Sequence, residues 1–265
     1  MRVKLLAIDL DGTLLNKDRK ISSKNQDAIR RAQDAGVTVM LASGRIRPSM
    51  VPFAESLGIE LPIVCGNGTY AYLAPEEPLY SLHLHSSVSE ALIAYATEKD
   101  IHLNLYTSDA MYFLSETPWA ELYRKRVETI IPQSYSPADA QTYIKAMIVD
   151  HPHHIQEHRK KLASILGLET RATESEAEYL EFMSTKATKG YALAQVAAQL
   201  GIEQGETAAI GDYLNDVEML EWAGISAAVE NAHSGAKQAA KVTVSSNELD
   251  GVAEFIDAYV LKQRQ

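Results

Sequence analysis

The sequence predicts an α/β protein with a parallel sheet, interrupted by an inserted α+β segment. Two patterns lead to this fold class. Near both ends of the chain, short apolar runs alternate with helix-like segments, and each run ends in a turn of Asp, Ser, Asn or Gly. The middle of the chain instead mixes hairpin and helix patterns. Strands alternating with helices indicate βαβ units, which build parallel sheets.

The first seventy residues contain three predicted buried strands separated by two helices. The strands are the apolar runs at 3–8, 37–42 and 62–65. The first helix has Ser23 as its N-cap, Gln26 to complete a capping box and Gly36 as its stop. The second helix covers 48–57 and is closed by Gly58. This spacing is typical of parallel strands joined by crossover helices.

The same alternation returns in the last third of the chain. The predicted elements are a helix at 190–200 ended by Gly201, a strand at 207–210, a helix at 215–222, a strand at 225–229, a helix at 234–240 and a strand at 242–244. Functional sites in open parallel sheets form where the strands end at their carboxyl side. We therefore expect one site to gather the residues that follow these strands, namely Asp9, Asp11, Ser43, Asn67 and Asp212.

The segment between the two parallel parts has a different pattern. It is predicted to contain a helix at 87–99, a hairpin within 103–114 with its turn at 107–109, a strand at 143–149, a helix at 152–166, and a strand pair at 169–173 and 179–183. We therefore predict two domains, a core formed by 1–81 and 187–265, and an inserted α/β domain formed by 82–186. Insertions are tolerated at exposed loop tips, and this one could cover the site edge.

The composition excludes several classes of protein. Apolar residues make up 46% of the chain and charged residues 23%, which is ordinary globular usage. The net charge of −10 argues against non-specific binding to nucleic acid or anionic membranes. Cys65 is the only cysteine, so an intrachain disulfide is impossible. No signal-peptide core precedes Asp9, and no apolar run approaches the roughly 18 residues of a membrane span. We expect a cytoplasmic protein with no nucleic-acid, membrane or protein partner.

The sharpest chemical signal is the Asp-Leu-Asp-Gly-Thr run that begins at Asp9. Two carboxylates two residues apart need a cation, a shared proton or diverging directions. A Mg²⁺ held with Asp9 and Asp212 would neutralise the site and leave room for a phosphate oxygen. Asp9 could then attack phosphorus, while Asp11 protonates the leaving oxygen. Gly12 permits a tight turn, and Thr13 can help backbone amides to hold phosphate.

Simpler explanations exist for each part of this signal. An EF-hand loop also begins Asp-x-Asp, but it needs a bidentate Glu at its twelfth position, where Lys20 stands. A turn of Asp and Gly after a strand is common by itself. Ser43 and the neighbouring Gly44 offer a hydroxyl and turn amides, and Lys189 offers a positive charge, as phosphoryl transfer requires. Taken singly, Ser43 also fits a helix cap and Lys189 a solvated surface lysine.

The turn at 211–216 combines two carboxylates and an amide in six residues. Asp212 can ligate a metal ion. Asp216 can hold the ligands in place, a supporting role that metal sites usually require. Tyr213 and Asn215 lie between them.

Together these segments resemble, in order, the four motifs of the haloacid dehalogenase superfamily. More narrowly, they are similar to its Cof-type phosphatases, which carry a large α/β cap of the C2 type. The matching segments are 9–13, 43–45, 189–190 and 211–216, with further similarity at 67–68, 231–232 and 250–253. The resemblance runs from end to end, and it implies a Rossmann-like core with a cap inserted after the third strand. Tyr213 departs from the pattern, because a small or amide residue is more usual there.

The resemblance also implies roles for individual residues. Asp9 would be the nucleophile that forms an aspartyl-phosphate, and Asp11 the general acid and base. Mg²⁺ would be held by Asp9, Asp212 and the backbone carbonyl of Asp11, with Asp216 behind them. The residues that would bind the phosphate or the substrate are Thr13, Ser43, Gly44, Lys189 and Asn215.

We therefore expect a Mg²⁺-dependent phosphatase for a small metabolite, either a sugar phosphate or a phosphorylated cofactor. One alternative is a phosphotransferase or mutase that uses the same aspartate. Another is a non-catalytic sensor of phosphorylated metabolites, which predicts a degraded catalytic set, whereas Asp9, Asp11, Lys189 and Asp212 are all present. Cap side chains would select the substrate, and a single cap sequence does not identify it.

Two weaker patterns do not change this interpretation. Residues 66–71 fit the dinucleotide pattern G-x-G-x-x-A, but a strand rather than the required helix is predicted next. The histidines at 151, 153, 154 and 158 begin a cap helix, with no carboxylate or cysteine nearby to complete a metal site. We interpret them as an exposed polar helix end.

Overall fold

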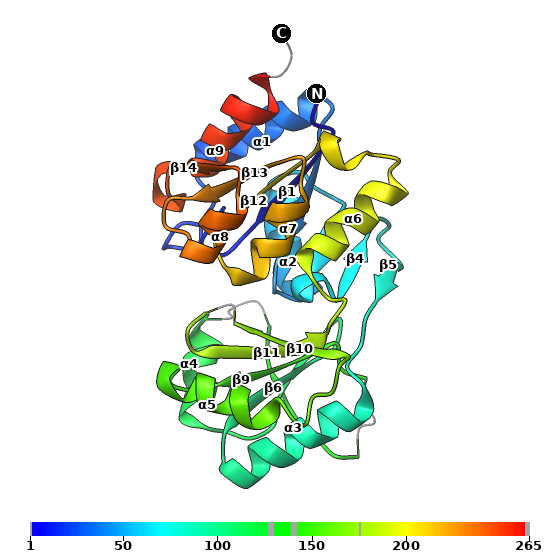
Figure 1. The fold of residues 1–265 in the computed structure, drawn as a ribbon, viewed down its shortest axis with the longest axis vertical. Coiled ribbons are helices and arrows are strands. Elements are labelled where there is room, and N and C mark those ends of the chain that lie inside the picture. The colour runs from blue at the N-terminus through cyan, green and yellow to red at the C-terminus, as the bar shows by residue number, and fades with distance from the viewer. Residues whose placement is uncertain (1, 127–129, 139–141, 175, 263–265) are drawn as a thin grey trace. The chain divides into compact units, whose positions relative to one another are not determined.

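The computed structural model describes residues 2–126, 130–138, 142–174 and 176–262. The chain forms two compact units (Figure 1). The first comprises Met1–Gly44, Pro52–Tyr80 and Thr188–Gln265, and the second comprises Arg45–Val51 and Ser81–Ala187. Among the described residues, no helix is both long and apolar enough to cross a lipid bilayer.

The first unit contains an eight-stranded sheet with the order β14-β13-β12-β1-β2-β3-β4-β5. Its strands are β1 (Leu5–Asp9), β2 (Thr38–Ala42), β3 (Ile63–Cys65), β4 (Tyr70–Tyr72), β5 (Pro78–Ser81), β12 (Thr207–Gly211), β13 (Ile225–Val229) and β14 (Val242–Val244). The strands from β14 to β3 pair in parallel, whereas β4 pairs antiparallel with β3. The predicted parallel sheet is therefore confirmed, with β1 at its centre and buried along its whole length.

Helices connect these parallel strands. They are α1 (Ser23–Asp34), α2 (Arg47–Ser56), α6 (Lys189–Gln199), α7 (Val217–Trp222), α8 (Ser234–Ala239) and α9 (Gly251–Phe255), the last continued by a π-turn at Ile256–Val260. Helix α1 packs against α9, and α7 packs against both α6 and α8. In Figure 1 the helices α6 and α7 lie in front of the strands. Apolar residues of α1 and of α6 are buried, as amphipathic crossover helices require.

The start of α1 differs by one residue from the prediction. Ser22, not Ser23, is the N-cap, and its Oγ accepts a hydrogen bond of 3.1 Å from the backbone N–H of Asn25. Gln26 donates instead to the carbonyl of Ile21. The adjacent serines at 22 and 23 offer similar caps, so the local sequence alone does not select one.

Two further strands of the first sheet lie between β3 and the segment Ser81–Ala187 of the second unit. The chain does not leave the sheet after β3, because β4 and β5 extend the sheet by two further strands. A short 3₁₀ turn (Gly66–Gly68) joins β3 to β4. The strand β4 at Tyr70–Tyr72 confirms that the glycines here do not open a dinucleotide-binding helix.

The second unit contains a six-stranded sheet with the order β10-β11-β9-β6-β7-β8. Its elements are α3 (Ser86–Lys99), β6 (His102–Tyr106), β7 (Met111–Phe113), α4 (Pro118–Arg126), β8 (Gln133–Ser134), β9 (Lys145–Val149), α5 (Pro152–Leu162), β10 (Thr170–Glu174) and β11 (Tyr179–Ser184). The strands pair antiparallel except for β7 with β8. The predicted hairpin and closing strand pair are confirmed, whereas α4 was not predicted and α5 ends earlier than expected.

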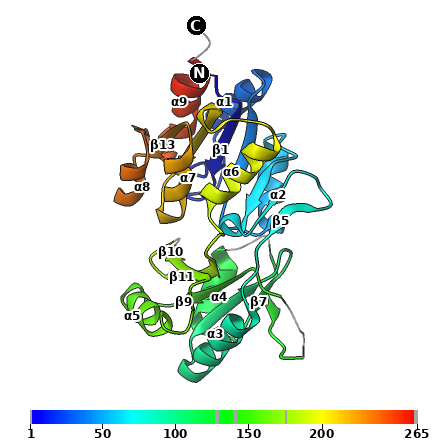
Figure 2. The same ribbon diagram turned by 45° about the vertical axis from the view of Figure 1, so that its right-hand side comes forward.

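The core of the second unit lies between its sheet and the helices α3 and α5 (Figure 2). Leu92 from α3 and Ile155 from α5 contact the same apolar cluster as Leu103 and Phe182 from the strands. All four side chains are almost completely buried. This α+β architecture agrees with the predicted fold class.

Candidate active site

Polar side chains converge where four adjacent strands of the first unit end. Asp9 closes β1, Ser43 follows β2, Asn67 follows β3 and Asp212 follows β12. These strands are neighbours in the order β12-β1-β2-β3, so their ends share one edge of the sheet. Asp9, Ser43 and Asn67 are buried, and Asp212 is partly exposed. The predicted convergence at the carboxyl edge is therefore present in the structure.

Lys189 links two carboxylates of this edge. It is the first residue of α6, where the hydroxyl of Thr188 caps the helix by accepting from the N–H of Tyr191. Its Nζ donates to Oδ1 of Asp9 at 2.5 Å and to Oδ1 of Asp216 at 2.6 Å. The side chain is completely buried. It is therefore a fixed part of the site rather than a solvated surface lysine.

Burial dominates the electrostatics of these groups. It raises the pKa of Asp9 well above its ordinary value, although the charge of Lys189 opposes this effect. Burial and the negative charge of Asp216 raise the pKa of Asp212 to about 7. For Lys189, burial alone would lower the pKa, but Asp216 and Asp9 outweigh it and raise the pKa above its usual range. Burial in this site therefore favours the protonated forms of Asp9 and Asp212 until a cation or a ligand offsets their charge.

Asp216 uses both of its oxygens inside the protein. Oδ1 accepts from Lys189, while Oδ2 accepts the backbone N–H groups of Asp212 at 2.9 Å and Tyr213 at 3.1 Å. The side chain has no exposed surface. Asp216 therefore fixes the turn that carries Asp212.

Thr13 and Gly12 shape the other side of Asp212. The buried hydroxyl of Thr13 donates to Oδ1 of Asp212 at 2.8 Å, so it orients this carboxylate instead of pointing to a phosphate. Gly12 has a φ of +84°, and a Cβ there would lie 2.4 Å from Oδ2 of Asp212. Only glycine fits this approach. The side-chain amide of Asn231 fixes the same turn by donating to the carbonyl of Gly12 at 2.8 Å.

Three carboxylates form a group that could hold a metal ion. Oxygens of Asp9, Asp212 and Asp216 lie within 4.8 Å of one another. Oδ2 of Asp9 is buried and has no hydrogen-bond partner among the described residues. Because carboxylate oxygens are hard ligands and Lys189 brings one positive charge to three carboxyl groups, a divalent cation beside Asp9 and Asp212 fits the donor set. Asp216 is better placed to hold the metal ligands than to bind the ion itself, since both of its oxygens already accept hydrogen bonds.

Asn67 and Asn215 make a contact that the motifs did not predict. Asn67 has a φ of 58° in the turn after β3, and its side chain is buried. Its Oδ1 accepts from Nδ2 of Asn215 at 2.9 Å, and its backbone N–H donates to the carbonyl of Ser43 at 2.9 Å. The side chain also packs on Gly44, where a Cβ would lie 3.1 Å from Oδ1 of Asn67. Asn67 therefore connects Ser43, Gly44 and Asn215.

Asp11 lies apart from the carboxylate group. It follows β1 by two residues, is exposed to solvent and bridges to Leu15 through the backbone. Its carboxylate is outside the group of three that could hold a metal ion. An exposed carboxyl beside the turn is accessible to a substrate.

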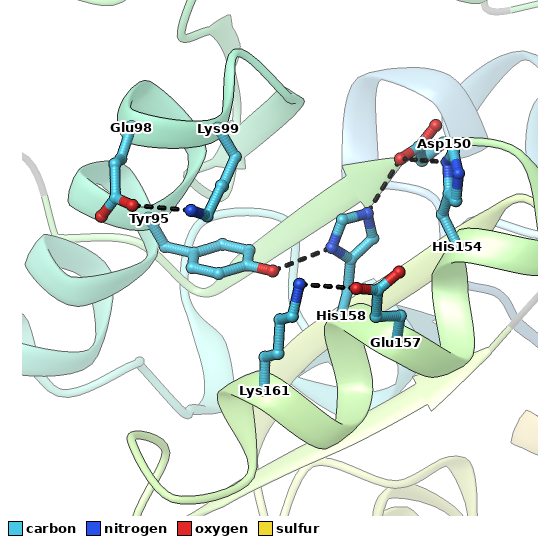
Figure 3. A network of polar contacts seen from close by, with 8 residues as sticks. All are labelled: Tyr95, Glu98, Lys99, Asp150, His154, Glu157, His158 and Lys161. Carbon is cyan, nitrogen blue, oxygen red and sulfur yellow. Dashed lines mark hydrogen bonds and ion pairs between the residues drawn. The ribbon is translucent and has the colours of Figure 1, made fainter.

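The histidines of the second unit form a different network (Figure 3). Asp150 lies beside them, contrary to our expectation that no carboxylate is near, and its Oδ2 contacts Nδ1 of His154 at 3.2 Å and Nε2 of His158 at 2.8 Å. The other ring nitrogen of His158 is 3.0 Å from the hydroxyl of Tyr95. Among the described residues, no three metal-ligating atoms of this cluster come together as they do at Asp9. The cluster therefore joins α3 to α5 through the hydrogen bond between Tyr95 and His158.

Comparison with known families places this geometry in context. Residues 6–256 match the family model described as haloacid dehalogenase-like hydrolase. The match covers almost the whole chain, including every strand end described above. It agrees with the resemblance that the four motifs indicated.

Individual relatives cover the chain equally well. A Bacillus subtilis protein named 5-amino-6-(5-phospho-D-ribitylamino)uracil phosphatase YwtE is 30% identical, over 96% of this chain and 97% of its own length. An Escherichia coli protein named pyridoxal phosphate phosphatase YbhA is 28% identical, over 98% of this chain and 100% of its own. The crystal structure of a haloacid dehalogenase-like hydrolase from Bacteroides thetaiotaomicron superposes with a TM-score of 0.86. It is 27% identical and covers 97% of this chain and 99% of its own.

Proposed function

Because this chain belongs to the haloacid dehalogenase-like hydrolase family, we propose that it removes phosphate from a small phosphorylated metabolite through an aspartyl-phosphate on Asp9. As a member of this family with named phosphatases as relatives, the chain is a phosphoric monoester hydrolase. The proposal concerns the residues, the metal ion and the substrate class.

The state of Asp9 is the observation that carries the proposal. Its Oδ1 is fixed by Lys189, while its Oδ2 is buried without a hydrogen-bond partner among the described residues. A buried carboxylate oxygen in this state is costly unless a ligand engages it. A phosphoryl group or a cation at this oxygen would remove that cost, and a carboxylate held from one side is oriented for attack on phosphorus.

The reaction then divides into two steps. In the first, a carboxylate oxygen of Asp9 forms a bond to phosphorus as the bond to the leaving oxygen breaks, and Asp11 gives that oxygen a proton. In the second, Asp11 takes a proton from water, and the water oxygen attacks the aspartyl-phosphate to release inorganic phosphate and free Asp9. Lys189 would hold the negative oxygens of the phosphoryl group in both steps.

The remaining residues would bind the phosphoryl group and orient the metal ligands. Ser43 and the backbone N–H of Gly44 would donate to phosphoryl oxygens, as would the amide of Asn215. Thr13 and Asp216 would instead act on Asp212, since that is where their hydrogen bonds go.

Mg²⁺ is the cofactor that we propose for this site. Asp9, Asp212 and the backbone carbonyl of Asp11 would hold it, because Mg²⁺ prefers oxygen ligands from one or two carboxylates together with substrate phosphate. When bound, the ion neutralises charge on the phosphoryl oxygens.

We propose a sugar phosphate or a phosphorylated cofactor or cofactor precursor as the substrate. Two relatives are named for small phosphate monoesters, one a ribitylaminouracil phosphate and the other pyridoxal phosphate. The core residues recognise the phosphoryl group that such compounds share. The leaving group of the substrate would be recognised by residues other than these.

The test is phosphate release from a panel of sugar phosphates, nucleotides, flavin phosphates and pyridoxal phosphate. Each compound is measured with Mg²⁺ and again with EDTA, and Asp9→Asn is the control, because the amide keeps the shape but not the nucleophile. We expect turnover that needs the metal ion and is lost in the variant. Binding of these compounds by the wild-type protein without any release would contradict the hydrolase and favour a sensor.

A further inference from the structure

Asn67 occupies the centre of the turns that would bind phosphate, although no motif assigns it a role. Its backbone N–H donates to the carbonyl of Ser43, and its side chain packs on Gly44. The next residue, Gly68, lies so close to Thr188 that a Cβ would be 2.2 Å from the carbonyl of Thr188. The turn after β3 is therefore packed between the residues that follow β2, Ser43 and Gly44, and the start of helix α6, which begins with Lys189.

The side chain of Asn67 also determines how Asn215 is oriented. A primary amide has two N–H groups and one carbonyl oxygen. Nδ2 of Asn215 gives one N–H to Oδ1 of Asn67 at 2.9 Å. If the Asn215 amide flipped, its oxygen would face the oxygen of Asn67, and the hydrogen bond would be replaced by a repulsion. The contact therefore fixes which edge of Asn215 carries the donors, and its other N–H has no partner among the residues that the structure describes.

We propose that Asn67 is a positioning residue that holds Asn215 as a hydrogen-bond donor to the phosphate. This inference rests on the proposed function, because it takes the strand-end edge as the phosphate site. The buried position of Asn67 supports it, since a side chain that is only 2% exposed keeps a single orientation. Its partner Asn215 is partly exposed, as a residue that meets a ligand must be.

The unusual backbone of Asn67 offers a clean variant. Its φ of 58° is in the left-handed region, which glycine adopts at no steric cost. Asn67→Gly therefore removes the amide and keeps the turn, whereas alanine would also strain the backbone. Asp100→Gly is the matched control, since Asp100 has a φ of 54° but belongs to the second unit, far along the chain from the strand ends.

The experiment measures the affinity of the Mg²⁺-loaded protein for inorganic phosphate by calorimetry, together with kcat and KM for the best substrate of the panel. We expect Asn67→Gly to weaken phosphate binding by about tenfold, the loss of one charge-assisted hydrogen bond. KM should rise by a similar factor. Asp100→Gly should leave both quantities at the wild-type values.

A double-mutant cycle separates positioning from a general structural effect. If Asn67 acts through Asn215, then Asn67→Gly should add little to the loss already caused by Asn215→Ala. Additive losses, or an unchanged phosphate affinity in Asn67→Gly, would overturn the inference. A wild-type protein that binds phosphate but shows no turnover would instead contradict the proposed function and leave this test valid.

Discussion

The ammonium group of Lys189 lies 2.5 Å from Oδ1 of Asp9, and both side chains are buried at the centre of the sheet edge. The contact joins the end of β1 to the start of α6 across 180 residues of sequence. It has two consequences. One oxygen of Asp9 is fixed in direction, and the negative charge of Asp9 is partly offset before any ligand arrives. The chemistry of the site can be tested through this pair.

Asp9→Asn should abolish phosphate release while the protein stays folded. An amide of the same shape still accepts a hydrogen bond from Lys189 through its oxygen, but it cannot form an aspartyl-phosphate. We expect turnover to fall by at least about a thousandfold, as in other enzymes that lose their nucleophile. Phosphate release and the unfolding temperature, measured on the same sample, check both parts. Residual turnover within about tenfold of the wild type would contradict the assignment of Asp9.

Asp216→Asn and Asp212→Asn should reduce the free energy of unfolding to different extents. Asp216 is completely buried and accepts hydrogen bonds on both oxygens, so the NH2 group of its amide variant must face either Lys189 or the backbone N–H groups of Asp212 and Tyr213. We expect a loss of about 3 kcal/mol in the free energy of unfolding. Asp212 is partly exposed, and an amide oxygen there still accepts from Thr13. The free energy of unfolding should fall by less than about 1 kcal/mol in Asp212→Asn.

Urea unfolding with and without Mg²⁺ compares the two variants. Mg²⁺ should raise the stability of the wild type in proportion to the logarithm of its concentration, because it binds only the folded protein. This increase should disappear in Asp212→Asn, where a metal ligand is lost. Two variants with equal losses of stability and equal responses to Mg²⁺ would refute the division of roles.

The location of this site followed from the sequence because local patterns determine it. Apolar runs that stop at Asp9, Ser43 and Asp212 predict buried strands, and parallel pairing brings their carboxyl ends to one edge. The adjacent glycines and acidic residues then indicate the chemistry. Each of these inferences needs only residues that are close together in sequence.

The contacts between side chains could not be predicted in the same way. The bond from Asn215 to Asn67 spans 148 residues, and the bond from Thr13 to Asp212 spans 199. Which of several polar groups pair across such separations depends on packing in three dimensions. Asp150 is an exception, because it lies only four and eight residues before His154 and His158, and the sequence analysis overlooked it although it is close in the chain.

A methyl group at Gly68 should damage the site through the backbone of Thr188. Gly68 has a φ of +92°, and a Cβ there would lie 2.2 Å from the carbonyl oxygen of Thr188. Gly68→Ala therefore forces the turn away from the residue that caps the helix of Lys189. We expect a loss of about 3 kcal/mol in the free energy of unfolding and a lower rate of phosphate release.

Gly58→Ala is the matched control for Gly68→Ala. Gly58 also has a positive φ, +63°, but no atom lies within 4 Å of the position of its Cβ. Gly58→Ala should reduce the free energy of unfolding only by the roughly 1 kcal/mol that an alanine in the left-handed conformation costs. Urea midpoints and phosphate release measured on both variants separate the clash from the strain. Equal losses would show that the approach of Thr188 does not matter.

His102 should make the second unit less stable in acid. Its side chain is 1% exposed, and Nδ1 shares a hydrogen bond with the hydroxyl of Thr117 at 2.8 Å. Burial lowers the pKa of His102 from 6.5 to about 4 in the folded protein. The unfolded chain therefore binds this proton at a higher pH than the folded chain does. The contribution of the neutral imidazole to the free energy of unfolding is fully present above about pH 6.5. It is lost progressively as the pH falls to about 4, by about 3 kcal/mol.

The measurement compares His102 with His102→Gln in a Trp222→Phe background, in which Trp119 of the second unit is the only tryptophan. Urea unfolding followed by tryptophan fluorescence then reports on that unit at pH 7 and at pH 4. Glutamine cannot bind the proton, so the variant should lose about 3 kcal/mol less between the two pH values. Carboxylates that titrate in the same range affect both proteins equally and cancel in the difference. Parallel pH profiles would show that His102 is protonated in the folded state, and the assignment of a neutral buried imidazole would then be wrong.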